Sequence, residues 1–238
     1  MATLCLFRDD PYLTEAAATV LEVDDRGGII LDKTVFYGTG GGQPGDSGVL
    51  KRAEGASVEI STAVYGDGDQ IVHVPAEGAR SLQRGEPVVA SIDWQRRYRH
   101  MRIHTGLHVL TVVLPFPVTG GRIGTEEAHL DFDIEGPVPT KDEVQYRLNE
   151  LLAQDRSVSS EWITDDELLA NPGIIKTRAV KPPIGTGRVR LIRIGDIDLQ
   201  PCGGTHVRST SEIGQLAVPK IENKGRQNRR VRIRLIGG

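Results

Sequence analysis

The pattern of the sequence changes at Asp93, and this change limits the folds that are open to the chain. Before it, short segments rich in β-branched residues alternate with turn clusters such as Asp-Arg-Gly-Gly. These segments cover residues 17–23, 28–36, 58–64, 70–74 and 87–92. Strands at this spacing predict a small β-barrel over residues 1–92. The 28 glycines of the 238-residue chain fit a structure with many turns.

After Asp93 the pattern becomes helical. Asp93 is a good N-cap, and the next residues place an apolar stripe on a helix that reaches about residue 114: Trp94, Tyr98, Met101, Leu107 and Leu110. Capping boxes at 140–143 and 164–167 predict two more helices. Strands are predicted at 128–134, 189–194, 215–221 and 230–236. Residues 93–238 are therefore expected to form an antiparallel sheet with helices packed on one face, which makes the fold class α+β.

The composition indicates a soluble globular protein, with 38% hydrophobic and 26% charged residues. No apolar run approaches the roughly 20 residues that span a bilayer, and the N-terminus does not resemble a signal peptide. The two cysteines do not form a disulfide framework. We therefore expect a cytoplasmic protein without a membrane partner. The sequence does not indicate the oligomeric state.

Four residues of the types that bind zinc occur as two pairs, each with a spacing of four positions. On a helix, His104 and His108 are separated by about 40° of rotation and about 6 Å of rise, so both can reach one ion. Cys202 and His206 are joined by Gly-Gly-Thr, and the glycines allow a loop to fold around an ion. Three imidazoles and a thiol suit Zn²⁺. The alternatives are a helix-surface histidine pair and a buried cysteine beside a structural histidine.

The role of such a metal stays open at this level. Four protein ligands close the coordination shell of a structural zinc, whereas catalysis needs an exchangeable position. Thr105 occupies the position where a zinc peptidase would carry its glutamate, so the sequence does not favour a peptidase. His100 lies one turn before His104 and is either a catalytic helper or a surface residue.

The ligands belong to two longer segments, Arg-Ile-His-Thr-Gly-Leu-His at 102–108 and Gly-Asp-Ile-Asp-Leu-Gln-Pro-Cys-Gly-Gly-Thr-His-Val at 195–207. Glu-Ile-Gly, Ile-Glu-Asn-Lys-Gly and Arg-Arg-Val-Arg follow at 212–214, 221–225 and 229–232. A glycine-rich run, Phe-Tyr-Gly-Thr-Gly-Gly-Gly-Gln-Pro-Gly-Asp-Ser-Gly, covers 36–48. Together these motifs resemble the editing domain of alanyl-tRNA synthetase and its relatives. The glycine-rich run is similar to the alanyl branch and is not expected in the threonyl branch.

The resemblance implies a free-standing alanyl-tRNA editing protein of the AlaX type, in its medium-length form, without an aminoacylation domain or a long C-terminal extension. Its expected activity is hydrolysis of the ester that joins serine, or glycine, to alanine tRNA. An alanine pocket excludes glycine poorly and rejects an added hydroxyl weakly, so a second hydrolytic sieve is useful. Zinc can polarise the ester and activate water, which would make His104, His108, Cys202 and His206 catalytic. Residues 93–238 would then form the zinc-binding deacylase domain.

The resemblance also suggests substrate-binding residues. Thr119 matches the position of a polar pocket residue in the family, so we expect it to form a hydrogen bond with the serine hydroxyl. The alternative is that Thr119 is an ordinary loop threonine. The loop around Gly41, Gly42 and Gln43 would shape entry to the active site, or it is a tight turn between strands. This loop is not followed by a helix-like segment and lacks Gly-Lys-Ser/Thr, so we expect no nucleotide cofactor.

Charge is distributed unevenly along the chain. Residues 1–92 carry 7 basic and 14 acidic residues, whereas residues 188–238 carry 11 basic and 4 acidic ones. A basic end suggests either a localised anionic partner, here tRNA, or a solvated charged face. The candidate phosphate contacts are Lys220, Lys224, Arg226, Arg229, Arg230 and Arg232.

Two other functions remain possible from the sequence. One is an RNA-binding module in which zinc only stabilises the fold. The other is a deacylase for a different mischarged tRNA, such as a threonyl-type substrate.

Overall fold

The computed structural model describes residues 2–177 and 187–237. The chain divides into two compact units, Met1–Tyr98 and Arg99–Gly238. The predicted division between residues 92 and 93 lies just before the helix α1 (Trp94–Val113), and the unit boundary lies within this helix. The assignment of residues 93–238 as a zinc-binding deacylase domain stays a prediction.

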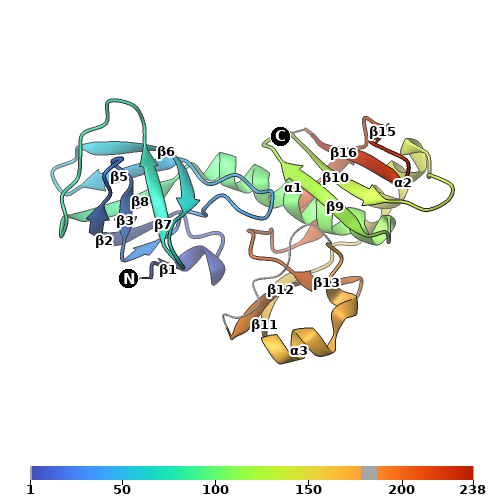
Figure 1. The fold of residues 1–238 in the computed structure, drawn as a ribbon. Helices are drawn as coiled ribbons and strands as arrows, with labels where there is room; N and C mark the ends of the chain where they lie inside the picture. The colour runs from blue at the N-terminus through green and yellow to red at the C-terminus, as the bar shows by residue number, and fades with distance from the viewer. Residues whose placement is uncertain (1, 178–186, 238) are drawn as a thin grey trace. The chain divides into compact units, whose positions relative to one another are not determined.

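The first unit is a closed antiparallel barrel of six strands in the order β2-β3-β7-β6-β5-β8 (Figure 1). These strands are β2 (Glu15–Val23), β3 (Ile29–Leu31), β5 (Gly48–Arg52), β6 (Ser57–Tyr65), β7 (Ile71–Pro75) and β8 (Pro87–Ile92). β1 (Leu4–Cys5) pairs in parallel with β4 (Lys33–Thr34), and a 3₁₀ turn covers Leu6–Arg8. The alternating strand residues fill the barrel with aliphatic side chains and Phe36, which confirms the predicted barrel.

The predicted strand at 28–36 is divided in two by Asp32. The Asp32 carboxylate accepts hydrogen bonds from the backbone N–H groups of Thr19 (2.7 Å) and Lys33 (2.9 Å). A side chain that takes over backbone donors in this way competes with the strand ladder. The sequence pattern missed β5, because this strand is short and ends in Lys51 and Arg52.

The second unit contains two antiparallel sheets and three α-helices among its described residues. The five-stranded sheet has the order β14-β16-β10-β9, with β15 also paired to β16. Its strands are β9 (Val118–Ile123), β10 (Glu127–Asp133), β14 (Gln215–Ala217), β15 (Ile221–Asn223) and β16 (Asn228–Ile236). The three-stranded sheet consists of β11 (Val158–Thr164), β12 (Arg188–Ile194) and β13 (Asp198–Pro201). The helices are α1, α2 (Lys141–Leu152) and α3 (Asp165–Ala170), and 3₁₀ turns cover Pro172–Ile174 and Thr210–Ile213.

Both predicted capping boxes are present at the N-termini of helices. Thr140 and Glu143 cap α2, and Thr164 and Glu167 cap α3. In each case the threonine hydroxyl accepts from the N3 backbone N–H, and the glutamate accepts from the N-cap N–H. The two helix starts were therefore predictable from local chemistry alone.

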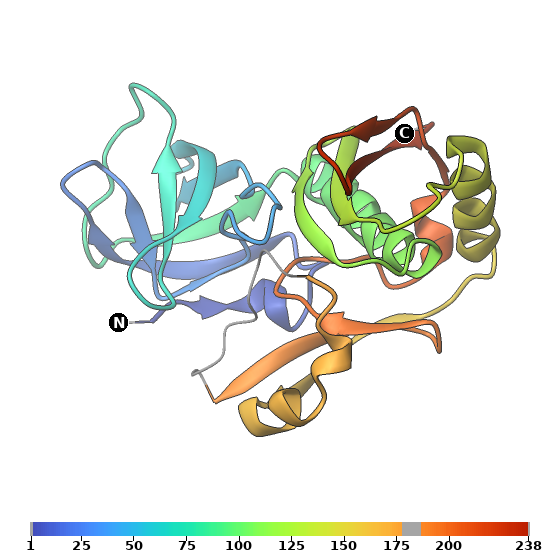
Figure 2. The same ribbon diagram turned by 45° about the vertical axis from the view of Figure 1, so that its right-hand side comes forward.

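The helix α1 is the centre of the second unit. It lies along one face of the five-stranded sheet (Figure 2), where Gly106 allows close approach. A Cβ at Gly106 would lie 2.7 Å from Leu216 Cδ1, which is closer than real side chains come. Residues 103–111 are all buried, so the helix is enclosed on more sides than the single predicted stripe suggested. The additional buried face carries the polar residues of the candidate site.

The three-stranded sheet has its own apolar contact with α3. Leu168 of α3 packs against Val189 and Leu191 of β12, together with residues of the adjoining 3₁₀ turn. Among the described residues, no helix combines the length and hydropathy needed to cross a membrane.

Candidate metal centre

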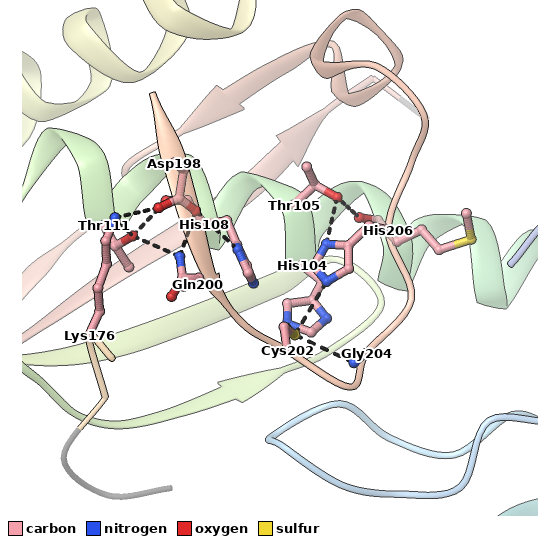
Figure 3. A network of polar contacts seen from close by, with 11 residues as sticks. His104, Thr105, His108, Thr111, Lys176, Asp198, Gln200, Cys202, Gly204 and His206 are labelled. Atoms are coloured by element: carbon pink, nitrogen blue, oxygen red, sulfur yellow. Dashed lines mark hydrogen bonds and ion pairs between the residues drawn. The ribbon is translucent and has the colours of Figure 1, made fainter. Parts of the chain in front are cut away.

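Four side chains from distant parts of the chain meet at one point beside α1 (Figure 3). His104 and His108 lie one turn apart on α1, and Cys202 and His206 come from the loop that follows β13. The ligand atoms of all four residues lie within 4.8 Å of one another. This cluster could hold a metal ion, and it is the set of residues that the sequence spacing predicted.

Two of the distances between the donor atoms are close to those of a tetrahedral site. Cys202 Sγ lies 3.5 Å from His104 Nε2 and 3.3 Å from His206 Nε2. Ideal zinc–sulfur and zinc–nitrogen bonds at a tetrahedral angle would separate a sulfur and a nitrogen ligand by about 3.6 Å. All three histidines are at least 94% buried, so their nitrogen donors are shielded from bulk water, whereas Cys202 is partly exposed. The cluster thus has the donor types, spacing and burial of a metal site.

Thr105 orients one of the imidazoles. Its hydroxyl donates to the carbonyl of Met101 at 2.8 Å and has only one hydrogen to give. It must therefore accept from His206 Nδ1, which lies 3.1 Å away. This hydrogen bond fixes the tautomer of His206 and leaves Nε2 free to bind a metal. Sequence reasoning used Thr105 only to reject a peptidase and missed this role.

Asp198 orients a second imidazole. Its carboxylate lies 3.3 Å from His108 Nδ1 and is almost fully buried. Gln200 donates to the same carboxylate at 2.7 Å, and Lys176 forms an ion pair with it. Thr111 accepts from Gln200 at 3.2 Å, which closes a connected polar network behind His108 (Figure 3). Sequence reasoning quoted Asp198 and Gln200 but gave them no role, although residues 198, 200 and 202 lie on one face of an extended strand.

The backbone of the ligand loop is fixed by Arg190 of β12. Arg190 Nη1 donates to the carbonyls of Cys202 (3.1 Å) and Gly204 (2.9 Å). The N–H of Gly204 points back to Cys202 Sγ at 3.4 Å. A hydrogen bond to sulfur favours the thiolate, which is the form that binds metals.

The cluster strongly perturbs the pKa values of its members. Burial raises the pKa of the Cys202 thiol, but the His104 and His206 imidazoles outweigh it and hold the pKa well below its usual value. Burial lowers the pKa of His206 well below its usual value. Burial also lowers the pKa of His108, but Asp198 and Cys202 outweigh it and raise it to about 9. Perturbed groups of this density are typical of functional sites.

Thr119 lies on β9 and not in a loop. The register between β9 and β10 shifts beside it, so Thr119 is the extra residue of a bulge. Its hydroxyl donates to the carbonyl of Asp131 and accepts from Asn228, both at 3.2 Å. Its predicted role toward the serine hydroxyl stays a prediction, and the hydroxyl oxygen retains one acceptor position for such a contact.

The glycine-rich loop forms a tight turn within the barrel unit. Gly40 and Gln43 exchange two backbone hydrogen bonds, and Gly41 and Gly42 have φ values of +56° and +82°. This is the geometry of a type I′ turn, which favours glycine at both central positions. Gln43 is fully buried, and the loop leads into the strand β5 rather than a helix. The predicted role of the loop at the active-site entrance stays a prediction.

The predicted phosphate contacts between residues 220 and 232 fall into two groups, cations that pair with carboxylates or turn oxygens and cations that are exposed. Arg230 forms a bidentate ion pair with Asp131, and Arg232 pairs with both Glu222 and Glu127. Lys220 also contacts Glu222, and Arg229 donates to backbone and side-chain oxygens of the 223–228 turn. In contrast, Lys224 and Arg226 lie exposed in that turn. Arg230 and Arg232 therefore stabilise the sheet, which a sequence count of cations does not reveal.

His100 is fully buried. Of the two alternatives that the sequence left open, the surface residue is therefore wrong, and the role as a catalytic helper stays a prediction.

The comparisons with known proteins identify the family to which this chain belongs. Residues 189–232, which include two of the candidate ligands, match the threonyl and alanyl tRNA synthetase second additional domain, and residues 6–96 match the class II (A) tRNA synthetases. The chain is 35% identical to the alanyl-tRNA editing protein AlaX-M of Methanosarcina mazei, over 98% of this chain and 97% of the relative. The chain belongs to the AlaX-M family. The AlaX-M protein of Saccharolobus solfataricus is 34% identical to this chain, and the match covers 95% of this chain and 96% of the relative.

The relationship also extends to a larger enzyme. The alanine–tRNA ligase of Pyrobaculum aerophilum is 36% identical over 91% of this chain, which corresponds to 25% of the ligase. The family resemblance that the motifs predicted is thus confirmed along nearly the whole chain.

Proposed function

We propose that this protein is a trans-editing hydrolase that removes serine, and also glycine, from mischarged alanine tRNA. The observation that carries the proposal is the buried His104–His108–Cys202–His206 cluster in a chain that belongs to the AlaX-M family. The substrate would be the ester that joins the amino acid to the terminal ribose. We place the reaction in the cytoplasm, where tRNA is charged.

The metal that best fits the cluster is Zn²⁺. Three imidazole nitrogens and one thiolate sulfur match its preferences, and the separations of Cys202 Sγ from two of the imidazole nitrogens are close to those that its bond lengths require. When bound, zinc acts as a Lewis acid toward an ester carbonyl and toward water. An aminoacyl ester is already activated, so modest catalysis is sufficient.

The chain's own residues have two tasks in this reaction. Thr105 and Asp198 hold the imidazoles of His206 and His108 in the tautomer that presents Nε2 to the metal. The buried network of Asp198, Gln200 and Lys176 supplies compensating charge and keeps the site rigid. Binding groups that are fixed before the substrate arrives do not need to reorganise during the reaction.

Deacylation assays test the proposal directly. Alanine tRNA charged with serine, glycine or alanine is incubated with the protein, and threonine tRNA charged with serine tests the threonyl-type alternative. We expect rapid release of serine from alanine tRNA, weaker release of glycine, and little release of alanine. Cys202→Ala should abolish the activity, whereas no release of serine by the native protein would refute the proposal.

A second candidate is an RNA-binding module with a purely structural zinc site, and the four-ligand cluster favours it because four protein ligands can close the shell. Spectroscopy of the cobalt-substituted protein separates the two functions. A spectrum that changes when a small competing ligand such as azide is added indicates an exchangeable position and supports catalysis. A spectrum that does not respond supports the structural role.

A further inference from the structure

An exposed aromatic residue that has no role in the proposed reaction lies on the same sheet as Arg190, which holds the ligand loop. Trp162 lies on β11, an edge strand of the three-stranded sheet (Figure 1), and 37% of its surface is exposed. The Arg188 guanidinium lies over its ring, 4.5 Å from the ring centroid. Tryptophan is enriched at binding surfaces, because its ring offers a large rigid contact area.

The strand register places this pair on the same face as the metal cluster. Trp162 lies directly opposite Arg190 of β12, and Arg190 accepts a backbone hydrogen bond from Cys202 at 3.1 Å. Directly opposed residues of antiparallel strands point to the same face. Trp162, Arg190 and Cys202 therefore form one row across the sheet. Asp198 and Gln200 lie on this same face, two positions apart along β13. They contact His108 and Thr111 of α1.

The row of three residues also determines how far Trp162 lies from Cys202. Neighbouring strands are separated by about 4.8 Å, so the Trp162 backbone lies roughly 10 Å from that of Cys202. This span is comparable with the length of one nucleoside. A ribose whose ester lies at the metal cluster would thus carry its base toward the Trp162–Arg188 pair.

We propose that Trp162 and Arg188 form a stacking platform for the base of the 3′-terminal nucleotide of the tRNA. Unpaired bases at RNA ends are recognised by stacking on aromatic rings and on arginine guanidinium planes. The positive charge of Arg188 also suits a nucleotide with its adjoining phosphate. This inference rests on the proposed function, since it assumes that the ester of a tRNA reaches the cluster.

The first test observes binding without hydrolysis. Trp94→Phe leaves Trp162 as the sole tryptophan, and its fluorescence is titrated with an uncharged acceptor-stem minihelix that ends in CCA. We expect saturable quenching by the CCA minihelix and much weaker quenching by a minihelix whose terminal nucleotide lacks its base. Equal quenching by both, or none by either, would overturn the platform.

The second test uses activity on serine-charged alanine tRNA. Trp162→Leu should raise KM by about tenfold, the usual effect of losing one stacked base, with little change in kcat. Trp162→Phe should retain most of the affinity, which controls for misfolding. Tyr146→Leu is the matched control, since Tyr146 is an exposed aromatic residue on α2. If Trp162→Leu has the same KM as the native protein, the platform is wrong.

The two tests separate this proposal from the proposed function. Base-dependent quenching in Trp94→Phe, together with no release of serine by the native protein, would retain the platform and contradict the hydrolase. Release of serine by the native protein, without base-dependent quenching in Trp94→Phe, would retain the hydrolase and contradict the platform.

Discussion

Individual side chains determine whether the four candidate ligands can act as a site. Histidine binds a metal through one nitrogen only when its other nitrogen is held in the right protonation state. Thr105 performs this task for His206, and Asp198 performs it for His108. The affinity of the cluster for a metal therefore depends on residues that do not touch the metal.

Asp198→Asn tests this dependence. The amide keeps the shape of the carboxylate but loses its charge, which leaves His108 and Lys176 without their anionic partner. We expect zinc affinity to fall by about 10- to 100-fold, measured by competition with a chromophoric chelator. Asp196→Asn is the control, since Asp196 is exposed and pairs with Arg156 instead. Equal affinities for the two variants would show that Asp198 does not support the site.

The burial of His73 predicts that the stability of the barrel unit depends on pH. It is fully buried between Ile29 and Thr34, and burial lowers its pKa from 6.5 to about 4. The unfolded chain therefore binds a proton between these values while the folded chain does not. This contribution of His73 to the free energy of unfolding is fully present above about pH 6.5, and the free energy decreases by about 3 kcal/mol as the pH falls to about 4.

Urea unfolding at several pH values between about 7 and about 4.5 measures this effect. In His73→Gln, which has no titrating ring, the loss of stability over this range should be smaller by about 2 to 3 kcal/mol. If His73→Gln retains the pH dependence of the native protein, another group is responsible.

At the level of elements, the sequence predicted the helices α1, α2 and α3 and the strands that are rich in apolar and β-branched residues, such as β6, β12 and β16. The capping boxes of α2 and α3 were readable because their chemistry is local. The strands β9, β11 and β13 were missed, since β9 contains two glycines, β11 is polar and exposed, and β13 has only four residues. Their formation depends on pairing with distant strands, which no local pattern reveals.

The candidate site was predictable to a similar extent. The spacing of His104, His108, Cys202 and His206 was sufficient to predict the cluster that the structure brings together. The roles of Thr105 and Asp198 were not predictable, because they arise from contacts between residues about 100 positions apart along the chain. The pairing of Arg230 and Arg232 with carboxylates of neighbouring strands was hidden from the sequence for the same reason.

A buried ion pair fixes the end of the glycine-rich segment in the barrel unit. Arg97 of α1 and Asp46 are both almost fully buried and form a bidentate pair, and Arg97 also donates to the carbonyl of Val35. Removing one partner leaves the other charge buried and unpaired. We expect Arg97→Ala to lower the free energy of unfolding by about 3 to 5 kcal/mol.

Chemical denaturation of Arg97→Ala measures this loss in the free energy of unfolding. Gln95→Ala is the control, because Gln95 is an exposed residue on the same helix. Gln95→Ala should differ from the native protein by less than about 0.5 kcal/mol. A loss of under 1 kcal/mol in Arg97→Ala would mean that water reaches the pair and that the unit does not depend on it.

At the scale of the whole molecule, the charge distribution predicts how tRNA binding responds to salt. The region 188–238 carries an excess of seven positive charges, but Arg230 and Arg232 are already paired with carboxylates. Lys224 and Arg226 are exposed in the 223–228 turn and are better placed to contact phosphates. Exposed cations contribute to the release of counterions, whereas paired cations contribute less.

Titration of tRNA binding against salt tests this distinction. Each of Lys224→Gln and Arg226→Gln should reduce the slope of log affinity against log salt by up to about one. Arg230→Gln removes the same charge and should change the slope less. Affinity that does not vary with salt in the native protein would contradict the assignment of this region to tRNA.

The central claim is that the four-residue cluster holds a zinc ion on which hydrolysis depends. The most direct measurement is the rate of serine release from mischarged alanine tRNA by protein that has been stripped of metal and then titrated with zinc. We predict negligible release by the stripped protein and a linear rise in rate that ends at one zinc ion per chain. Full activity in the stripped protein would contradict the claim.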